Sequence, residues 1–120
     1  MEYKIGFTRS EIQCFCGCGF AVEDRLFIHR LSLAQLKYGR SFIITDWCRC
    51  AESNRKKSRS IFSPHLRGIA AHIEVFNDLD RFKVVKALII TGFKRLVVTP
   101  KHIHVDTDQT KDLWCFRVEV

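Results

Sequence analysis

Apolar residues recur at helical spacing in the N-terminal half of the chain. Between residues 22 and 38, one set of positions steps by three or four residues, as on one face of a helix: Val22, Leu26, His29, Leu33 and Leu36. Glu23 and Asp24 suit the positive N-terminal end of such a helix, and Gly39 suits its C-terminal end. The pattern predicts a helix over 22–38 that packs through this face. His29 is then expected to be a hydrogen-bonded core residue rather than a ligand.

A second helix is predicted over residues 78–92. Asp78 can cap its N-terminus and Gly92 can end it. Its apolar positions also lie on one side: Leu79, Phe82, Val85 and Ile89. We expect this side to face the same core as the first helix.

Alternating patterns predict the strands. In 68–75, alternate residues divide into an apolar face with Ile69, Ala71, Ile73 and Val75, and a second face with Ala70, His72 and Glu74. Further strand patterns cover 41–45, 93–99, 102–107 and 113–120. Residues 46–64 read as a long polar and basic loop. The order of elements predicts an α+β fold, an antiparallel sheet with two main helices packed on it, in a single domain over residues 1–120.

Composition narrows the class of protein. The chain has 120 residues, which suits one domain, and its 47% apolar residues exclude a disordered chain. No apolar run approaches the roughly 20 residues of a membrane span, and no signal peptide is recognisable at the start. We therefore expect cytoplasmic synthesis. A net charge of +7 favours anionic partners, although the basic run 54–60 (NRKKSRS) is typical of a solvated loop.

The six cysteines leave three interpretations open. Cys14, Cys16, Cys18, Cys48, Cys50 and Cys115 lack the paired CxxC spacing of a zinc ribbon. Packed thiols in a reducing compartment are the first interpretation. A metal site built from Cys14, Cys16, Cys18 and Cys50 is the second, and a disulfide is the third.

Four of the five histidines fall in two short segments. His65 precedes the strand that carries His72, and His102 and His104 share the polar face of a later strand. Three imidazoles and one open position form a known zinc arrangement for hydrolysis. Surface or core histidines would give the same spacing, so the pattern by itself leaves both interpretations open.

Longer blocks resemble a known family. SPHLRGIAAHI (63–73), KHIHVDTD (101–108) and LWCF (113–116) resemble the M15 zinc peptidases, which include D-Ala-D-Ala carboxypeptidases and phage endolysins and share a fold with the hedgehog signalling domain. The small single-domain branch is the most similar. Its serine–x–histidine–x–x–glycine–x–alanine block is matched by Ser63, His65, Gly68 and Ala70. RSEIQCFCGCG (9–19) and ITDWCRCAESN (44–54) extend the resemblance over about residues 8–116.

The resemblance implies a site and a reaction. His65 and His104 would bind Zn²⁺, with His72 as third ligand where the family has an aspartate. His102 would assist the transition state as an acid or an electrostatic stabiliser. Arg49 would bind a substrate carboxylate or carbonyl, and Ser63 belongs to the substrate side of the same block. The reaction implied is hydrolysis of amide bonds in peptidoglycan stem peptides, at the bacterial cell wall after release of the enzyme.

Departures from the family pattern define the alternatives. His72 could support the metal site or impair it. If it impairs the site, the chain would be a binding module for cell wall or protein. Glu74 could replace His72 as the third ligand. Asp46 and Trp47 replace serine and glycine and are expected to narrow access beside Arg49. A basic nucleic-acid binder is a third hypothesis, but no nucleic-acid motif supports it. We expect a monomer with a peptidoglycan peptide as partner and with neither nucleic acid nor membrane.

Overall fold

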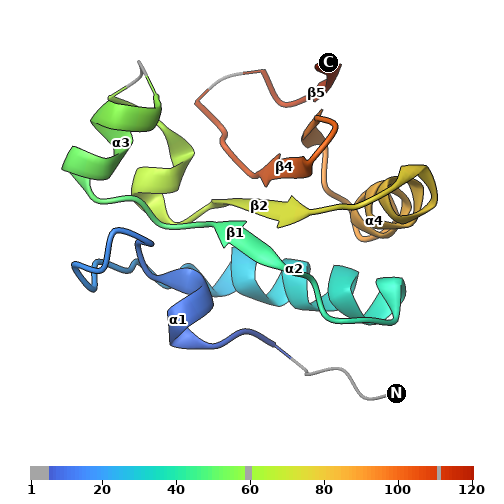
Figure 1. Ribbon diagram of the computed structural model, residues 1–120, viewed down its shortest axis with the longest axis horizontal. Coiled ribbons are helices and arrows are strands. Elements are labelled where there is room, and N and C mark those ends of the chain that lie inside the picture. Colours follow the sequence, from blue (N-terminus) through green and yellow to red (C-terminus); the bar gives the residue numbers. More distant parts are fainter. Residues whose placement is uncertain (1–5, 59–60, 111) are drawn as a thin grey trace.

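The fold is a single sheet with helices on both sides (Figure 1). The computed structural model describes residues 6–58, 61–110 and 112–120, so the last two residues of the basic run 54–60 lie outside the described part. Within it the helices are α1 (Arg9–Ile12), α2 (Arg25–Tyr38), α3 (Ala51–Lys57) and α4 (Asp78–Ile90), with a 3₁₀ turn η1 (Pro64–Arg67). The strands are β1 (Ile44–Asp46), β2 (Ala70–Glu74), β3 (Arg95–Val98), β4 (His102–Asp106) and β5 (Cys115–Val118).

The sheet has the strand order β1-β2-β4-β3-β5. The pairs β1–β2, β2–β4 and β4–β3 are antiparallel, as the sequence predicts. The last pair, β3–β5, is parallel, so the sheet is mixed rather than wholly antiparallel. The α+β class is confirmed. The parallel pair arises because β5 returns to the outer edge of β3 instead of forming a hairpin with β4.

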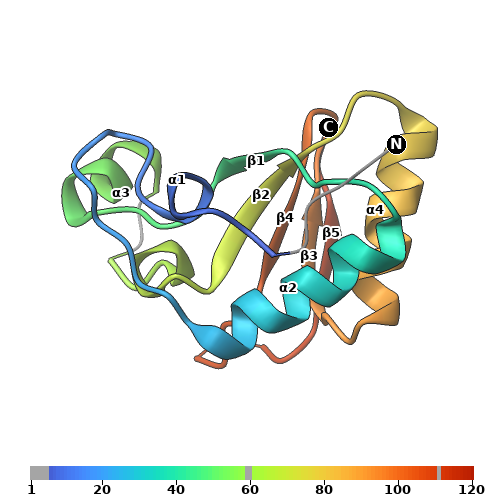
Figure 2. The ribbon, with the colours of Figure 1, turned by 90° about the horizontal axis from the view of Figure 1, so that it is seen from below.

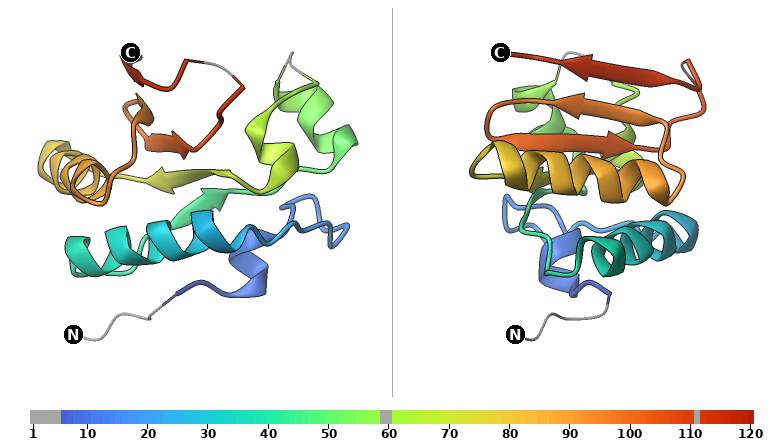
Figure 3. Two further views of the ribbon diagram at one scale, coloured as in Figure 1. Left: turned by 180° about the vertical axis from the view of Figure 1, so that it is seen from behind. Right: turned by 90° about the vertical axis from the view of Figure 1, so that its right-hand side faces the viewer.

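The core lies between the sheet and two long helices. The helices α2 and α4 lie next to each other on one side of the sheet, whereas α3 and η1 lie on the other (Figure 2 and Figure 3). Ile73 of β2 and Ile103 of β4 are fully buried and face each other across the ladder. Each such side chain stabilises the fold by roughly 1.5–3 kcal/mol. The alternation expected for 68–75 is therefore confirmed, and the histidines of both strands point to the opposite side.

Helix α2 ends where predicted, but it begins at Arg25 instead of residue 22, and its buried face is different. Asp24 caps it by accepting a hydrogen bond from the Phe27 N–H, and Gly39 ends it with φ 83°. The residues that face the core are Phe27, Leu31, Ala34 and Gln35, while Leu26 is 84% exposed. Phe27 packs edge-on against Trp47 and Phe93, and these aromatic contacts decide which side turns inward. His29 is exposed, so its assignment to the core is wrong.

Helix α4 shows the same shift of phase. Asn77, not Asp78, caps it, through a hydrogen bond from the Asp80 N–H to the Asn77 side chain. The core side is Val84, Ala87 and Leu88. Of the side predicted to be buried, Leu79, Phe82 and Ile89 are exposed and Val85 is half-buried. Both helices carry two apolar rows, and packing against the sheet selects between them.

The segment 46–64 is not one long loop. It contains α3, which begins after Cys50, and it ends at η1, which Ser63 caps and where Pro64 is the first residue. The basic residues of α3 lie in its last turn, where positive charge suits the C-terminal end of a helix. The sequence pattern did not predict α3, because this short helix is stabilised at its ends and has no apolar face that would give a helical pattern.

The described helices include none long and apolar enough to cross a membrane.

Candidate metal centre

The ladder between β2 and β4 brings two histidines together. In the antiparallel register His72 pairs directly with His104, and both side chains point away from the core formed by Ile73 and Ile103. The Nε2 atom of His72 lies 3.1 Å from the Nδ1 atom of His104. A slip of either strand by one residue would turn its histidine into the core, so the buried face of the sheet also fixes the site.

The turn η1 supplies the third histidine. Ser63 accepts a hydrogen bond from the His65 N–H, and Gly68 closes the turn with φ 71°. A side chain at Gly68 would place Cβ 2.2 Å from the carbonyl oxygen of Val22, so only glycine fits this close approach. The His65 ring lies 4.9 Å from that of His72 and 5.4 Å from that of His104, centroid to centroid.

These three histidines form one candidate metal site. One ligand nitrogen from each of His65, His72 and His104 lies within 4.8 Å of the other two. Two nitrogens bound tetrahedrally to one zinc at about 2.0–2.1 Å would lie roughly 3.3 Å apart. The 3.1 Å between His72 and His104 is close to that separation.

Two rings are oriented by hydrogen bonds on the side away from the centre. The Nδ1–H of His65 donates to the Trp47 carbonyl at 2.6 Å, and the Nε2–H of His104 donates to Asp106 at 2.7 Å. These bonds leave a lone pair on Nε2 of His65, which has no partner, and one on Nδ1 of His104, which accepts a hydrogen bond from Nε2 of His72 at 3.1 Å. Partners of this kind orient histidine ligands and raise their basicity in metal sites.

The unpartnered nitrogen of His65 tests the fit to a metal. Its Nε2 atom is buried and has no hydrogen-bond partner. A buried polar atom without a partner costs roughly 1–3 kcal/mol, so its persistence calls for a ligand. Imidazole nitrogen is a preferred donor for zinc, and three such donors leave a fourth position open. The residues present therefore fit a zinc ion.

The environment of His65 and His72 keeps both rings neutral. Burial, followed by the charge of Arg49, lowers the pKa of His65 to about 3. Burial and the neighbouring His65 and His104 rings lower the pKa of His72 to about 2. Burial raises the pKa of Asp106, but hydrogen bonds from His104, from the Asp108 N–H and from Arg95 outweigh it and hold that pKa below its usual range. At neutral pH His65 and His72 can therefore bind a cation without first losing a proton.

His102 lies beside the centre without joining it. Its ring stacks on that of His72, with centroids 4.4 Å apart and an interplanar angle of 10°. Burial, followed by the charge of His104, lowers the pKa of His102. Glu74, the substitute ligand considered above, is not among the residues whose ligand atoms converge.

Arg49 is held in place by Asp46. The guanidinium donates from Nε at 2.9 Å and from Nη2 at 2.6 Å to the same oxygen of Asp46, and both side chains are buried. The same Asp46 oxygen lies 4.0 Å from Nδ1 of His72. The carboxylate thus faces the histidine that replaces the family's acidic ligand, and it supplies negative charge near that position.

An open hollow of about 470 Å³ adjoins these residues. Its lining includes Arg49, Ser63, His65, His72, His102 and His104. Lys57, Arg95 and Arg117 add positive charge to it, each beside an acidic side chain. Ser63 is buried and caps η1, so its visible task is to shape the turn that carries His65.

Asp46 and Trp47 were expected to narrow access beside Arg49, and for Trp47 this is wrong. Trp47 is fully buried in the core, where its Nε1–H donates to the Gly68 carbonyl at 2.9 Å. Its backbone carbonyl, not its ring, serves the site by orienting His65. Sequence reasoning also missed Asp106 and Asp46 as orienting residues. For Asp106 there was a usable pattern, because alternate residues of a strand share a face and Asp106 follows His104 by two.

A group of three histidines, two on the sheet and one on η1, beside an open hollow matches the class of metal-dependent hydrolases that keep one coordination position free. A family model described as Peptidase M15 matches residues 5–106. That range covers most of the chain and all three histidines, and the chain belongs to the Peptidase M15 family. Membership makes the class of activity peptide hydrolysis. Among curated proteins and among solved structures, no match is found.

Proposed function

We propose that this protein is a zinc-dependent peptidase that hydrolyses amide bonds in the stem peptides of peptidoglycan. The observation that carries the proposal is the convergence of one nitrogen each from His65, His72 and His104 within 4.8 Å. Two supporting features are the buried, unpartnered Nε2 of His65 and the membership of the chain in a peptidase family. The ligand roles themselves remain predictions.

Zinc, when bound, supplies Lewis-acid polarisation of the scissile carbonyl and activation of water for attack. The chain's own residues do the rest. His65, His72 and His104 would hold the ion, because the ladder and η1 fix the positions of their rings. Asp106 and the Trp47 carbonyl keep two of these rings in the required tautomer.

Arg49 is placed to orient the substrate. Two of its five N–H donors are engaged by Asp46, and Arg49 is one of the residues that line the hollow. A planar guanidinium suits a carboxylate or a carbonyl, and stem peptides carry both. Because Asp46 fixes the fork in advance, little conformational entropy is lost when the substrate binds.

His102 is the protic group beside the centre. Its lowered pKa makes it a neutral imidazole at neutral pH, which can donate one N–H to charge that develops on the reacting amide. Stacking on His72 restricts its orientation. This supports assistance by hydrogen bonding rather than by a permanent positive charge.

Charge supports a wall substrate. The net charge of +7 and the basic residues of the hollow favour a carboxylate-rich, anionic polymer. We propose action at the bacterial cell wall by a monomeric enzyme, with neither nucleic acid nor membrane as partner.

The decisive experiment is mass spectrometry of muropeptides after incubation with zinc-loaded protein. New fragments that lack a stem residue would identify the bond cleaved, and loss of turbidity of stripped cell walls gives the rate. Three forms should be compared: the native chain, His72→Ala and His72→Asp. We expect the native chain to be active, His72→Ala to lose activity and His72→Asp to keep it, since aspartate is the family's ligand.

An inactive native chain that gains activity as His72→Asp would instead identify a binding module derived from a peptidase. Activity near zero in all three zinc-loaded forms would overturn the peptidase proposal.

A further inference from the structure

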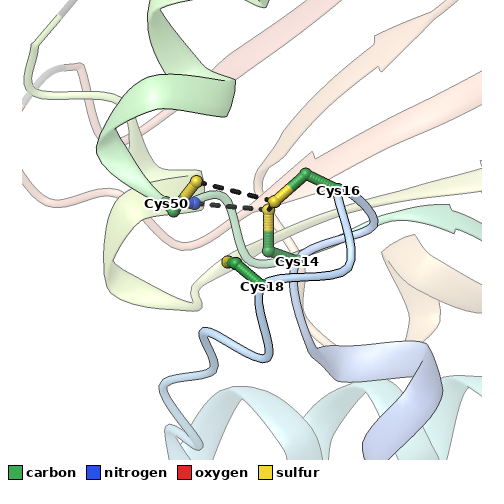
Figure 4. Close-up of side chains that lie close together, drawn as sticks. All are labelled: Cys14, Cys16, Cys18 and Cys50. Atoms are coloured by element: carbon green, nitrogen blue, oxygen red, sulfur yellow. Dashed lines mark hydrogen bonds between the residues drawn. The ribbon is translucent and has the colours of Figure 1, made fainter.

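A second group of metal-ligand side chains lies on the N-terminal part of the fold. The sulfur atoms of Cys14, Cys16, Cys18 and Cys50 all lie within 4.8 Å of one another (Figure 4). Three of them come from the turn that follows α1, and Cys50 is the N-cap residue of α3. Residues 34 positions apart in the sequence thus present their sulfurs to a common point: Sγ of Cys16 lies 3.8 Å from that of Cys50 and 3.3 Å from that of Cys14.

The separations suit one ion. Sulfurs bound tetrahedrally to a single zinc at about 2.3 Å would lie roughly 3.8 Å apart. In an iron–sulfur cluster the thiolates are shared among several iron atoms, which spreads the sulfurs further than four ligands of one ion. A mononuclear tetrahedral centre therefore fits best.

Backbone amides point at the sulfurs. The N–H of Cys50 donates to Sγ of Cys14 at 3.5 Å, that of Ser53 donates to Sγ of Cys50 at 3.4 Å, and that of Phe20 donates to Sγ of Cys18 at 3.4 Å. Donors of this kind stabilise the thiolate form, which is the form that binds metals. Three of the four sulfurs have such a donor.

Core packing does not explain the group. All six cysteines are free, and Cys14 and Cys48 are buried as packed thiols would be. Cys16 and Cys18 are exposed and add nothing to the core, yet they lie beside Cys14 and Cys50. The six thiols therefore divide into Cys48 and Cys115, outside the group, and four that converge.

We propose that Cys14, Cys16, Cys18 and Cys50 bind one structural zinc ion, separate from the histidine centre. Four protein sulfurs fill the tetrahedral positions and leave none open for substrate, which is the mark of a structural site. Binding replaces the four thiol protons by the metal, and no oxidant or reductant takes part.

The position of Cys50 indicates a structural role for this ion. Arg49 and the Trp47 carbonyl, both close to the histidine centre, lie within three residues of Cys50. The zinc would tie the turn 14–18 to the start of α3 and thereby hold the segment that carries them. The site would add a cross-link to a small domain, which has limited core to stabilise it.

Cobalt substitution tests the proposal without relying on activity. Co²⁺ bound by thiolates gives an intense near-ultraviolet charge-transfer band that histidine ligands do not give. The chain carrying His65→Ala and His104→Ala, which lacks the histidine centre, should bind one Co²⁺ and show this band. Adding Cys16→Ser and Cys50→Ser should abolish it, whereas adding Cys115→Ser, the matched control outside the group, should leave it unchanged.

X-ray absorption of zinc protein purified without chelator tests the proposal even if the chain with the added cysteine substitutions fails to fold. In the chain with His65→Ala and His104→Ala, we expect a zinc shell made only of sulfur at about 2.3 Å. A folded chain without thiolate band and with only nitrogen or oxygen around zinc would overturn the proposal. Disulfides among these cysteines in protein from a reducing cytosol would also overturn the proposal. They would appear as a decrease in the intact mass by the hydrogens lost. A native chain that shows the sulfur-only zinc shell or the thiolate band but does not lyse cell walls would count against the peptidase proposal alone.

Discussion

The histidine group and the cysteine group are built in different ways. His72 and His104 lie on adjacent strands whose register is fixed by fully buried neighbours, and hydrogen bonds orient the rings of His65 and His104. Cys16 and Cys18 lie in an exposed turn with no strand to position them. The sheet therefore positions the histidine ligands before any metal binds, whereas a metal at the cysteine site would itself order the turn 14–18.

A short segment connects the two groups. Asp46 and Arg49 face the histidines, and Cys50 faces the other sulfurs. Gly68 forms a second connection, because it closes the turn of His65 against the backbone of Val22, which follows the cysteine turn. Changes in either group can therefore be tested for effects on the other.

The largest expected effect comes from removing a histidine ligand. His104→Ala should reduce wall lysis by at least about 10³-fold, because the ion that activates water is lost. The cysteine group should keep its thiolate band in the same variant, since its ligands are separate. Rates from turbidity and metal content from elemental analysis check this. Undiminished lysis by a folded His104→Ala chain would contradict the assignment.

A change at the connection should act on stability. Gly68→Ala forces a side chain into left-handed backbone and against the Val22 carbonyl, and should lower the free energy of unfolding by about 3 kcal/mol or more. Gly39→Ala is the matched control, because its φ of 83° is similar but nothing lies within 4 Å. It should cost only about 1–2 kcal/mol. Urea unfolding measures both, and equal costs would show that the contact with Val22 is unimportant.

A smaller effect is expected from an orienting residue. Asp106→Asn weakens the hydrogen bond that sets the His104 tautomer and should reduce zinc affinity at the histidine centre by about 10–100-fold. Affinity at the cysteine centre should not change. Competition with a zinc chelator gives both constants. Asp112→Asn, at an exposed site, serves as control, and a loss of the same size there would remove the specific role of Asp106.

The most gradual effect is that of acid on the metal-free protein. The folded-state pKa values of His65 and His72, about 3 and about 2, lie below the ordinary value of 6.5, so between these limits the unfolded chain binds more protons. Stability should be complete above pH 6.5 and fall by up to about 1.4 kcal/mol per pH unit for each ring as pH decreases. Urea unfolding across this range measures the slope. His72→Gln should make it shallower, and an unchanged slope would show that His72 is not buried as a neutral ring.

Much of the fold follows from local pattern. The strands at 68–75, 93–99, 102–107 and 113–120 appear where alternation predicts them, and helices occupy most of 22–38 and 78–92. The buried faces of both helices were predicted wrongly. The reason is physical: each helix has two apolar rows at helical spacing, and only contact with aromatic residues and the sheet selects the inner one.

The candidate site shows a similar division. His65, His72, His102 and His104 could be named from the sequence because alternate residues of a strand share a face. Asp46 and the Trp47 carbonyl could not be named from the sequence, since their roles depend on contacts with His72 and His65, which lie far from them in the chain. Cys50 could be proposed as a partner of the N-terminal cysteines, but their spacing favoured packed thiols and also allowed a disulfide.

The sequence by itself determined the α+β class, the peptidase family and the histidines that carry the candidate chemistry, because periodicity and motif are local properties of the chain. Tertiary structure alone decided which helix faces are buried, how β5 joins the sheet and which four sulfurs meet. Those outcomes depend on contacts between residues far apart in the chain, whose geometry is set by packing the whole domain rather than by any one segment.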